Sequence, residues 1–221
     1  MAPMSARYDC SDATERAAGL AEAATALRKG ELAVIPTDTV YGIAADAFAP
    51  DAVAGLLAAK GRGRDMPPPV LTGSVRAAAA LVTDLGETGR ALVEEFWPGG
   101  LTLVCRVNPS LMWDLGDTMG TVAIRMPLHQ LALELLKETG PLAVSSANRS
   151  GEPAAVTAAA AQEQLGDAVA VYLDGGECPG PVPSTIVDLT APVPKLLRRG
   201  AISADRLREV ITLAAEDGGD E

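Results

Sequence analysis

Apolar residues recur at helical spacing in several stretches of the chain. Between Ala17 and Leu27 this spacing predicts a helix that begins after Ser11, a good N-cap residue, and ends at Gly30. A helix over residues 51–60 is predicted in the same way and carries Lys60 at its end. Further helices are predicted over residues 88–97, from about His129, over 157–166 and over 203–214.

Short apolar runs between glycines, prolines and polar residues predict the strands. They cover residues 32–35, 101–105, 121–125, 142–145, 169–173 and 184–189. The strands near 101 and 121 are joined without a helix, so we expect a mixed sheet rather than an all-parallel one. Prolines hold residues 66–69 extended before the apolar pair Val70–Leu71.

Length and composition favour one α/β domain. The chain has 221 residues, of which 48% are hydrophobic and only 3% are aromatic. That is enough for one core of aliphatic side chains, which suits helices packed on a sheet. A Gly/Pro-rich loop over residues 174–183 is our candidate for a mobile lid, and the acidic tail over 216–221 is expected to be disordered.

Charge and cysteine content exclude several classes of protein. The formal net charge of −11 argues against broad, sequence-independent binding of nucleic acid. Three widely spaced cysteines without C-x-x-C spacing indicate neither a disulfide framework nor a zinc site. The sequence has no N-terminal signal pattern and no apolar run of about 18 residues, so we expect a cytoplasmic protein without a membrane partner.

Against this acidic background, the run Lys60-Gly61-Arg62-Gly63-Arg64 is unusual. Cations at alternate positions cannot share one helical face, and the glycines let a ligand approach the backbone. We interpret the run as a loop that leaves a helix and binds an anion. A solvated, flexible basic loop without a ligand is an equally good interpretation of this run alone.

Two apolar strands lead directly into polar segments. Residues 37–42 bring three hydroxyl groups to the carboxyl end of the strand 32–35, where open α/β sheets bind ligands. Residues 145–151 follow the strand 142–145, although such a segment alone is more often a helix cap or an Asx turn. Arg125 ends an apolar strand, where its charge must find a partner. The pair Arg198–Arg199 would by itself more often be a surface pair.

Hydroxyls, one amide and several cations suit positioning and charge stabilisation, as in transfer of a nucleotidyl or phosphoryl group. The sequence contains neither G-x-x-x-x-G-K-[ST] nor G-x-G-x-x-G after a strand, so the common phosphate-binding motifs are absent. The single histidine, His129, is expected to be a partly exposed helix-start residue. Mechanisms that need a histidine base beside a nucleophile, or several histidine metal ligands, are therefore disfavoured.

Seven short blocks, taken in order, resemble the threonylcarbamoyl-AMP synthase family, which has the YrdC-like fold. The blocks are Pro36–Gly42, Lys60–Arg62, Phe96–Gly99, Thr121–Pro127, Ser145–Gly151, Ser184–Ile186 and Leu197–Gly200. The match covers about residues 15–202. It implies an open, twisted, mixed β-sheet flanked by helices in a single YrdC-like domain over residues 1–221. The helix 203–214 and the acidic tail would follow the core.

The resemblance implies a nucleotidyltransferase that joins L-threonine, bicarbonate and ATP into L-threonylcarbamoyladenylate and pyrophosphate. A partner transferase would then use this adenylate to make threonylcarbamoyladenosine (t6A) in tRNA. Mg²⁺ would accompany the ATP, held by phosphates and water rather than by protein ligands.

The site residues are also implied by the resemblance. The family's K-x-R and S-x-N marker residues fall on Lys60, Arg62, Ser146 and Asn148. The threonine-binding positions fall on Thr39, Arg125, Ser146 and Ser184, and the ATP-binding positions fall on Arg62, Thr121, Asn148 and Arg198. Lys60 and Arg62 are expected to be catalytic, and Lys60 is expected to hold bicarbonate or the carbamate anion.

The sequence departs from the family pattern in the basic loop. Many members continue as K-x-R-P-x-x-N-P-L-x-x-H, whereas this chain has Gly63, Met66 and Leu71 at the Pro, Asn and His positions. The contacts of that Asn and His are lost, or are replaced by Arg64 or backbone groups. Val156 and its neighbours likewise replace a Ser-Pro-Thr run. The chain is similar to the short, single-domain form of the family.

Two alternatives remain open. One is a carbamoyl-adenylate-forming enzyme like the YrdC-like portion of hydrogenase-maturation carbamoyltransferases, whose acylphosphatase part and zinc-binding cysteine pairs are not visible here. The other is a non-catalytic RNA-binding or ribosome-maturation module. A basic concavity around Lys60, Arg62, Arg64, Arg149 and Arg198 could then make a weak contact with tRNA.

Overall fold

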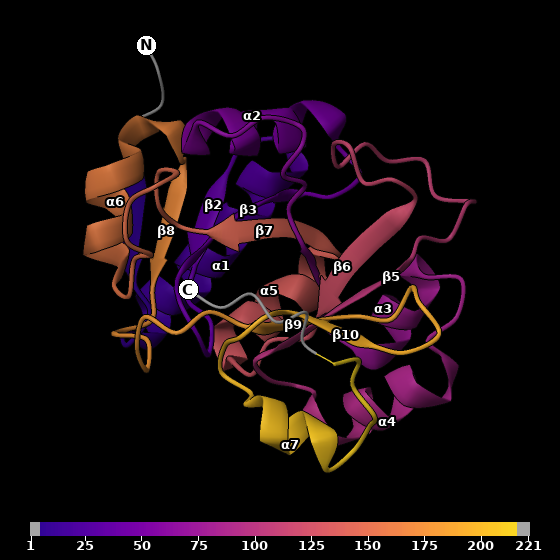
Figure 1. Ribbon diagram of the computed structural model, residues 1–221. Coiled ribbons are helices and arrows are strands. Elements are labelled where there is room, and N and C mark those ends of the chain that lie inside the picture. The colour runs from indigo at the N-terminus through magenta and orange to yellow at the C-terminus, as the bar shows by residue number, and fades with distance from the viewer. Residues whose placement is uncertain (1–4, 216–221) are drawn as a thin grey trace.

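The computed structural model describes residues 5–215, which form one mixed sheet with helices packed against it (Figure 1). The strands are β1 (Ala6–Asp9), β2 (Ala33–Ile35), β3 (Gly42–Asp46), β4 (Val70–Leu71), β5 (Leu101–Arg106), β6 (Thr121–Arg125), β7 (Leu142–Ser146), β8 (Val171–Asp174), β9 (Thr185–Asp188) and β10 (Lys195–Arg198). The helices are α1 (Ala13–Arg28), α2 (Pro50–Lys60), α3 (Val75–Leu81), α4 (Gly86–Phe96), α5 (Gln130–Thr139), α6 (Ala158–Leu165) and α7 (Ala204–Arg208), with a 3-10 turn, η1 (Gly166–Ala168).

The strand order is β1-β8-β2-β3-β7-β4-β6-β5-β9-β10. The sheet contains parallel pairs such as β2–β8 and β5–β9 and antiparallel pairs such as β3–β7 and β5–β6, so the predicted mixed sheet is confirmed. In particular, β5 and β6 pair antiparallel without an intervening helix, as their connection predicted. The middle strands are short and almost fully buried.

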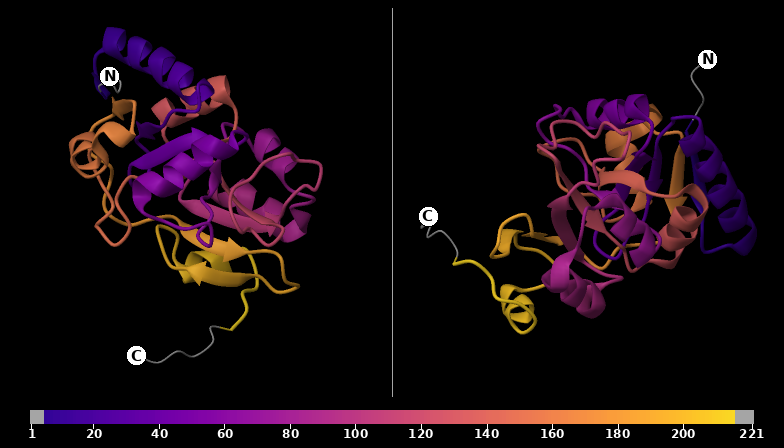
Figure 2. Two further views of the ribbon diagram at one scale, coloured as in Figure 1. Left: turned by 90° about the horizontal axis from the view of Figure 1, so that it is seen from above. Right: turned by 90° about the vertical axis from the view of Figure 1, so that its right-hand side faces the viewer.

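Three clusters of aliphatic residues hold the helices to the sheet. Helices α1 and α5 pack on one face of the β2–β3–β7–β8 region, and α2 and α6 pack on the other face. Helices α3, α4 and α7 pack against β5, β6 and β9. Figure 2 shows α1 and the C-terminal β9–β10–α7 segment at opposite ends of the molecule. Of the helices within residues 5–215, none has the length and apolar character needed to cross a membrane.

Strands β5 and β6 show how the sequence pattern creates a site. Their side chains alternate between the two faces, as expected for a strand. One set packs into the cluster with α3, α4 and α7, and consists of Leu101, Leu103, Cys105, Val122 and Ile124. The other set is more polar, lines a cavity, and consists of Thr102, Val104, Thr121, Ala123 and Arg125.

Two glycines shape the chain next to this cavity. Gly61 caps α2 in the left-handed conformation, with φ 67°, and turns the chain away after Lys60. The predicted loop after this helix is therefore confirmed. Gly42 begins β3, and a Cβ atom there would lie 2.5 Å from Cγ1 of Val144 on β7. Only glycine therefore lets these two strands approach this closely.

Most predicted elements are confirmed, but some are wrong or were missed. The N-cap of α1 is Asp12, whose carboxylate accepts from the N–H groups of Thr14 and Glu15, and not Ser11. The final helix ends at Arg208 rather than at residue 214, because residues 209–211 turn the chain, with the Val210 and Ile211 N–H groups donating to the Leu207 carbonyl, and the Ala214 N–H donates to the Pro194 carbonyl. The predicted disordered tail, 216–221, lies outside the described residues. The strands and α-helices that were missed are β1, β3, β4, β10 and α3.

Candidate active site

A cavity of about 800 Å³ lies over the polar face of β5 and β6 and extends to β4, β7, β9 and β10. Its rim comes from the loop after α2, from residues 145–154 and from the prolines Pro181 and Pro183. Strand β6 crosses the floor, since both its first residue, Thr121, and its last, Arg125, line the cavity. The site therefore covers one face of the sheet rather than only the carboxyl ends of parallel strands.

The structure brings eight of the nine predicted site residues together on the wall of this cavity. They are Thr39, Arg62, Thr121, Arg125, Ser146, Asn148, Ser184 and Arg198. They come from segments up to 159 residues apart in sequence (198 − 39), so the fold alone unites them. Lys60, the ninth, lies just beneath the wall.

Arg125 is the most constrained cation of the site. It is 6% exposed, and all three of its guanidinium nitrogens are hydrogen-bonded. Nε donates to the Gly99 carbonyl at 2.9 Å, Nη1 donates to Thr39 Oγ1 at 3.0 Å, and Nη2 donates to Asp38 Oδ1 at 2.6 Å. The expectation that a charge at the end of this strand must find a partner is confirmed. Burial lowers the pKa of Arg125, and the Asp38 carboxylate opposes that shift.

A second group of polar residues surrounds Ser184. The Ser184 and Thr102 hydroxyls are hydrogen-bonded at 2.8 Å, and both residues are buried. Arg198 donates to the Ser184 carbonyl through Nε and Nη2, and to the Ser184 hydroxyl through Nη2 at 3.0 Å. Arg198 is therefore part of the site and not a free surface pair with Arg199.

The third guanidinium, Arg62, is only partly satisfied by protein. Nη1 donates to Ser145 Oγ at 3.2 Å, whereas Nε is buried without a hydrogen-bond partner. A buried donor in this state is costly, and a ligand oxygen would satisfy it. Burial first, and then the charges of Arg125 and Arg62, lower the pKa of Arg198, so both neighbouring guanidinium groups act on Arg198. The cavity is thus electropositive and suited to an anion.

Lys60 is 1% exposed and holds the loop from Ser146 to Asn148. Its Nζ donates to the Ser146 carbonyl, to the Asn148 carbonyl at 2.6 Å and to Asn148 Oδ1 at 3.1 Å. Asn148 completes the loop, because its Nδ2 donates to the carbonyls of Arg149 and Glu152. The ammonium of Lys60 therefore faces protein oxygens rather than the cavity. That it holds bicarbonate stays a prediction.

The burial of Lys60 predicts a pH-dependent stability. Burial, together with the Arg62 charge, lowers the pKa of Lys60 from 10.5 to about 7. Between these pH values the unfolded chain binds more protons than the folded protein does. The contribution of Lys60 to the free energy of unfolding should therefore rise with pH above 7, by at most about 1.4 kcal/mol per pH unit. The three buried cysteine thiols, whose pKa burial raises, oppose this rise toward pH 9. Urea unfolding at pH 7, 8 and 9 measures this slope.

A Lys60→Met variant is the control for this slope, since methionine keeps the apolar stem and removes the titrating group. The free energy of unfolding of the wild-type protein minus that of Lys60→Met should increase from pH 7 to pH 9. Parallel pH profiles would show that Lys60 does not titrate in this range.

The departures from the family pattern have visible consequences. Arg64 does not line the cavity; its guanidinium is bonded to Asp114 and approaches Asp117 at 3.5 Å. The hypothesis that Arg64 replaces a lost contact is therefore not supported by this arrangement. Met66 and Leu71, at the positions of the family's Asn and His, do line the cavity and make that part of its wall apolar.

Hydrogen bonds fix the first half of the loop 174–183, and the second half of the loop borders the cavity. The Tyr41 hydroxyl donates to the Gly176 carbonyl at 2.6 Å and accepts from the Gly175 N–H at 3.1 Å. Cys178 is also fixed, because its N–H donates to the Val156 carbonyl. The residues that reach the cavity, Pro181 and Pro183, follow this tether. Mobility of the loop stays a prediction.

Replacing Tyr41 with phenylalanine tests the tether. Loss of two buried hydrogen bonds should lower the free energy of unfolding by about 1–2 kcal/mol and increase amide exchange at residues 175–178. Tyr172→Phe is a matched control, because that equally buried hydroxyl donates to the Gly166 carbonyl, away from the loop. Equal amide exchange at residues 175–178 in Tyr41→Phe and Tyr172→Phe would show that the Tyr41 hydroxyl does not hold the loop.

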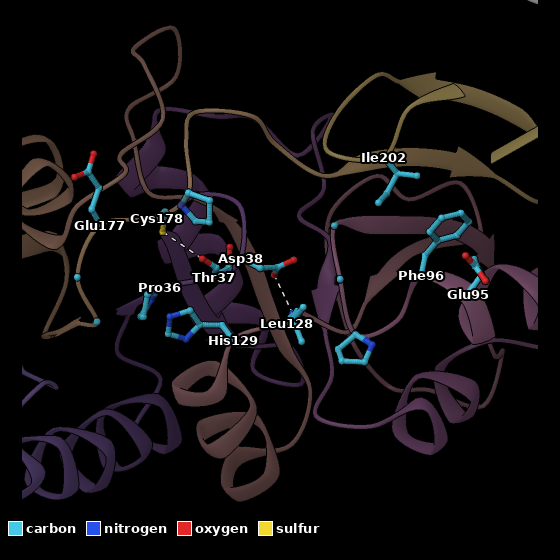
Figure 3. A pocket seen from close by; sticks show the side chains of 16 residues that line it. Pro36, Thr37, Asp38, Glu95, Phe96, Leu128, His129, Glu177, Cys178 and Ile202 are labelled. Atoms are coloured by element: carbon cyan, nitrogen blue, oxygen red, sulfur yellow. Dashed lines mark hydrogen bonds between the residues drawn. The ribbon is translucent and has the colours of Figure 1, made fainter. Parts of the chain in front are cut away.

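A second cavity, of about 650 Å³, lies next to the first and shares Thr37 with it (Figure 3). Asp38, His129 and Cys178 line it, and the Cys178 thiol lies 3.2 Å from the Thr37 carbonyl. His129 is the half-buried N-cap residue of α5, so its predicted place at a helix start is confirmed. Burial lowers the pKa of His129. No predicted site residue lines this second cavity.

Asp38, Thr102 and Ser145 are among the polar residues at the site that sequence reasoning missed. Asp38 and Ser145 lie inside blocks that carried the resemblance, so position beside a motif residue was the available signal. Thr102 is a single hydroxyl in an otherwise apolar strand, Leu101–Arg106. A buried threonine in such a strand needs a partner, which is Ser184. Among residues 5–215, no group of three or more His, Cys, Asp or Glu side chains could hold a metal ion.

Comparisons with known proteins agree with this geometry. The family model Sua5_yciO_yrdC, described as telomere recombination, matches residues 25–200. A Mycobacterium tuberculosis protein provisionally named threonylcarbamoyl-AMP synthase is 54% identical over 212 residues, which is 96% of this chain and 98% of that protein. The Bacillus subtilis threonylcarbamoyl-AMP synthase is 39% identical over 194 residues, which is 87% of this chain and 56% of that protein.

A solved structure is similar over nearly the whole chain. The crystal structure of Pyrococcus abyssi Sua5 complexed with L-threonine matches with a TM-score of 0.85 and 33% identity. The match covers 96% of this chain and 62% of that one. This chain therefore spans nearly all of the mycobacterial relative but less than two thirds of the archaeal protein.

Proposed function

This chain belongs to the Sua5/YciO/YrdC family, and on that premise we propose that it is a threonylcarbamoyl-AMP synthase. It joins L-threonine, bicarbonate and ATP into threonylcarbamoyl-AMP, with release of pyrophosphate and water. The observation that carries the proposal is the convergence of Arg62, Arg125 and Arg198 with three hydroxyl residues on one cavity. A fork of guanidinium donors suits carboxylates and phosphates, which are the anionic groups of these substrates.

Threonine is assigned to the Arg125 end of the cavity. Arg125 donates to the amino-acid carboxylate through the N–H groups that are not hydrogen-bonded to protein. The hydroxyls of Thr39, Ser146 and Ser184 orient the amine and side chain of the substrate. Support comes from the burial of Thr39 and Ser184 and from their contacts with Arg125 and Arg198, which fix both hydroxyls in place.

ATP is assigned to the Arg62 and Arg198 side. Arg62 turns so that its Nε, buried and unpartnered in the structure, donates to a phosphate oxygen, and Arg198 adds positive charge. Thr121 and Asn148 complete the nucleotide contacts. The carboxylates on the cavity wall, Asp65 and Glu152, are both exposed. Mg²⁺ would therefore be held mainly by the triphosphate and water, and it would neutralise phosphate charge there.

The reaction needs few proton transfers from protein groups. The threonine amine attacks the carbon of bicarbonate, and loss of water leaves a carbamate. A carbamate oxygen then attacks the α-phosphorus, and the bond to the pyrophosphate leaving group breaks. Arg62 and Arg198 stabilise the negative charge that builds up on the phosphoryl oxygens. Lys60 acts through the 146–148 loop that its ammonium holds, and its predicted contact with bicarbonate requires a movement of that ammonium.

Further assignments follow from the same proposal. The adenylate is consumed by a tRNA-modifying threonylcarbamoyl transferase, so we place the protein in the cytoplasm with the tRNA-modification machinery. Any contact with tRNA itself is weak, given the net charge of −11. The loop 174–183 closes over bound substrates, which reduced amide exchange with ATP and threonine would reveal.

Pyrophosphate release with single omissions tests the proposal. Purified protein with ATP, Mg²⁺, bicarbonate and L-threonine should release pyrophosphate, and leaving out any one component should abolish the release. Release that requires carbamoyl phosphate in place of threonine and bicarbonate would favour a carbamoyl-adenylate enzyme. No release under any condition, together with salt-sensitive binding of tRNA, would favour the RNA-binding alternative.

A further inference from the structure

Asp38 is an acidic residue at the site to which the motif comparison assigns no role. Its side chain is 15% exposed and forms an ion pair with Arg125, whose side chain is 7% exposed. Asp38 Oδ1 accepts from Arg125 Nη2 at 2.6 Å and from the Leu128 N–H at 2.9 Å. The second of these hydrogen bonds is drawn in Figure 3, where Asp38 stands beside Leu128 on the side of the second cavity.

The contacts of Arg125 leave a defined set of donors for a ligand. A guanidinium carries five N–H groups. Gly99, Thr39 and Asp38 take one each, on Nε, Nη1 and Nη2 respectively. One N–H therefore remains on each terminal nitrogen, which is the number that a carboxylate accepts in a two-point contact.

Asp38 also connects Arg125 to a rigid part of the fold. Leu128 lies two residues before α5, which packs on the sheet through Leu131 and Leu135. On the other side, the Thr39 hydroxyl that accepts from Arg125 is itself hydrogen-bonded to Thr37 Oγ1 at 3.0 Å. The guanidinium is thus held at three points, and Asp38 is the only one of the three that carries a charge.

We propose that Asp38 is the positioning residue that orients the Arg125 guanidinium for the carboxylate of threonine. This inference rests on the proposed function and deepens it. Asp38 does not touch the substrate; it acts through Arg125, and it keeps this buried cation from turning toward the ATP phosphates. Threonine recognition, and not ATP recognition, should therefore depend on Asp38.

The role depends on the acceptor oxygen more than on the charge, because Oδ1 makes both hydrogen bonds. Asparagine offers the same oxygen. Asp38→Asn should therefore keep the KM for threonine within about threefold of the wild-type value. Asp38→Ala removes the acceptor and should raise that KM about 10- to 100-fold, with the KM for ATP unchanged.

A double-mutant cycle tests whether Asp38 acts through Arg125. KM values for threonine and ATP are measured for Asp38→Ala, Arg125→Ala and the double variant. In the Arg125→Ala background, Asp38→Ala should cause no further rise in the KM for threonine. Additive effects, equal changes for both substrates, or an unchanged or lower KM in Asp38→Ala would overturn the proposal.

Asp114→Ala is the matched control, because Asp114 also pairs with an arginine, Arg64, and accepts from a backbone N–H, that of Gly116, but lies outside the cavity. It should leave both KM values unchanged. Circular dichroism and thermal unfolding show whether each variant is folded, and Asp38→Ser, whose shorter side chain withdraws the acceptor oxygen from Arg125, serves with the same expected rise in the KM for threonine if the alanine variant is not. Failure of the wild-type protein to form any adenylate would refute the proposed function, whereas normal threonine kinetics in Asp38→Ala would refute only this inference.

Discussion

A Lys60→Ala variant loses about 100-fold or more in kcat. Removal of the ammonium leaves three carbonyl oxygens of residues 146 and 148 without their donor, at a place that is closed to water. The loop can then no longer hold Ser146 and Asn148 at the cavity wall. A displacement of about 1 Å in a positioning group is enough for a loss of this size. Steady-state release of pyrophosphate measures the change.

Hydrogen exchange distinguishes this account from direct contact between Lys60 and the bicarbonate. If Lys60 acts by holding the loop, amide exchange at residues 146–150 rises in Lys60→Ala along with the loss of turnover. The Ser150 N–H is a useful reporter, because it donates to the Lys60 backbone carbonyl, which the substitution keeps. Unchanged exchange with lost activity would show that the ammonium acts on the substrate itself.

Arg125→Lys raises the KM for L-threonine about 100-fold, although the positive charge is kept. Lysine offers a single point charge and cannot reproduce the contacts with Gly99, Thr39 and Asp38 while still meeting a carboxylate at two points. Loss of one partner in a buried, hydrogen-bonded charge pair costs about 2–5 kcal/mol, which corresponds to roughly 30- to several-thousand-fold in binding. Steady-state pyrophosphate release at varied threonine concentrations measures the rise in KM.

Arg206→Lys is the control for Arg125→Lys. Arg206 pairs with Glu95 and Glu209 on the surface, at 55% exposure, and lies outside the cavity. Exposed pairs of this kind contribute about 0–1 kcal/mol, so threonine affinity should not change. A similar loss in both variants would mean that a general effect of replacing an arginine, and not the Arg125 site, lowers the affinity.

The sequence predicted the residues that line the cavity better than the residues that hold them in place. Residues such as Arg62, Ser146 and Ser184 lie in short, contiguous motifs that can be matched one by one, and all three line the cavity. The position of Lys60 could not be predicted in this way. Its acceptors lie 86 and 88 residues further along the chain, and burial of an ammonium depends on that long-range contact.

The secondary structure shows the same contrast between features set by local sequence and features set by long-range contacts. Helices α2 and α5 carry apolar residues at clear helical spacing, and both were predicted. Strand β3 was missed because its sequence, Gly-Ile-Ala-Ala-Asp, has neither alternation nor β-branched residues beyond Ile43. It is a strand because it is paired on both sides, with β2 and β7, which local propensity does not record.

The most direct test of the central claim is the mass of the product formed in a single turnover with ¹³C-labelled bicarbonate, L-threonine, ATP and Mg²⁺. Chromatography with mass spectrometry should reveal one adduct that contains AMP, threonine and one carbonyl group. Its mass should increase by one ¹³C substitution relative to unlabelled bicarbonate. An AMP product that lacks threonine, or one whose mass does not respond to the label, would contradict the assignment as a threonylcarbamoyl-AMP synthase.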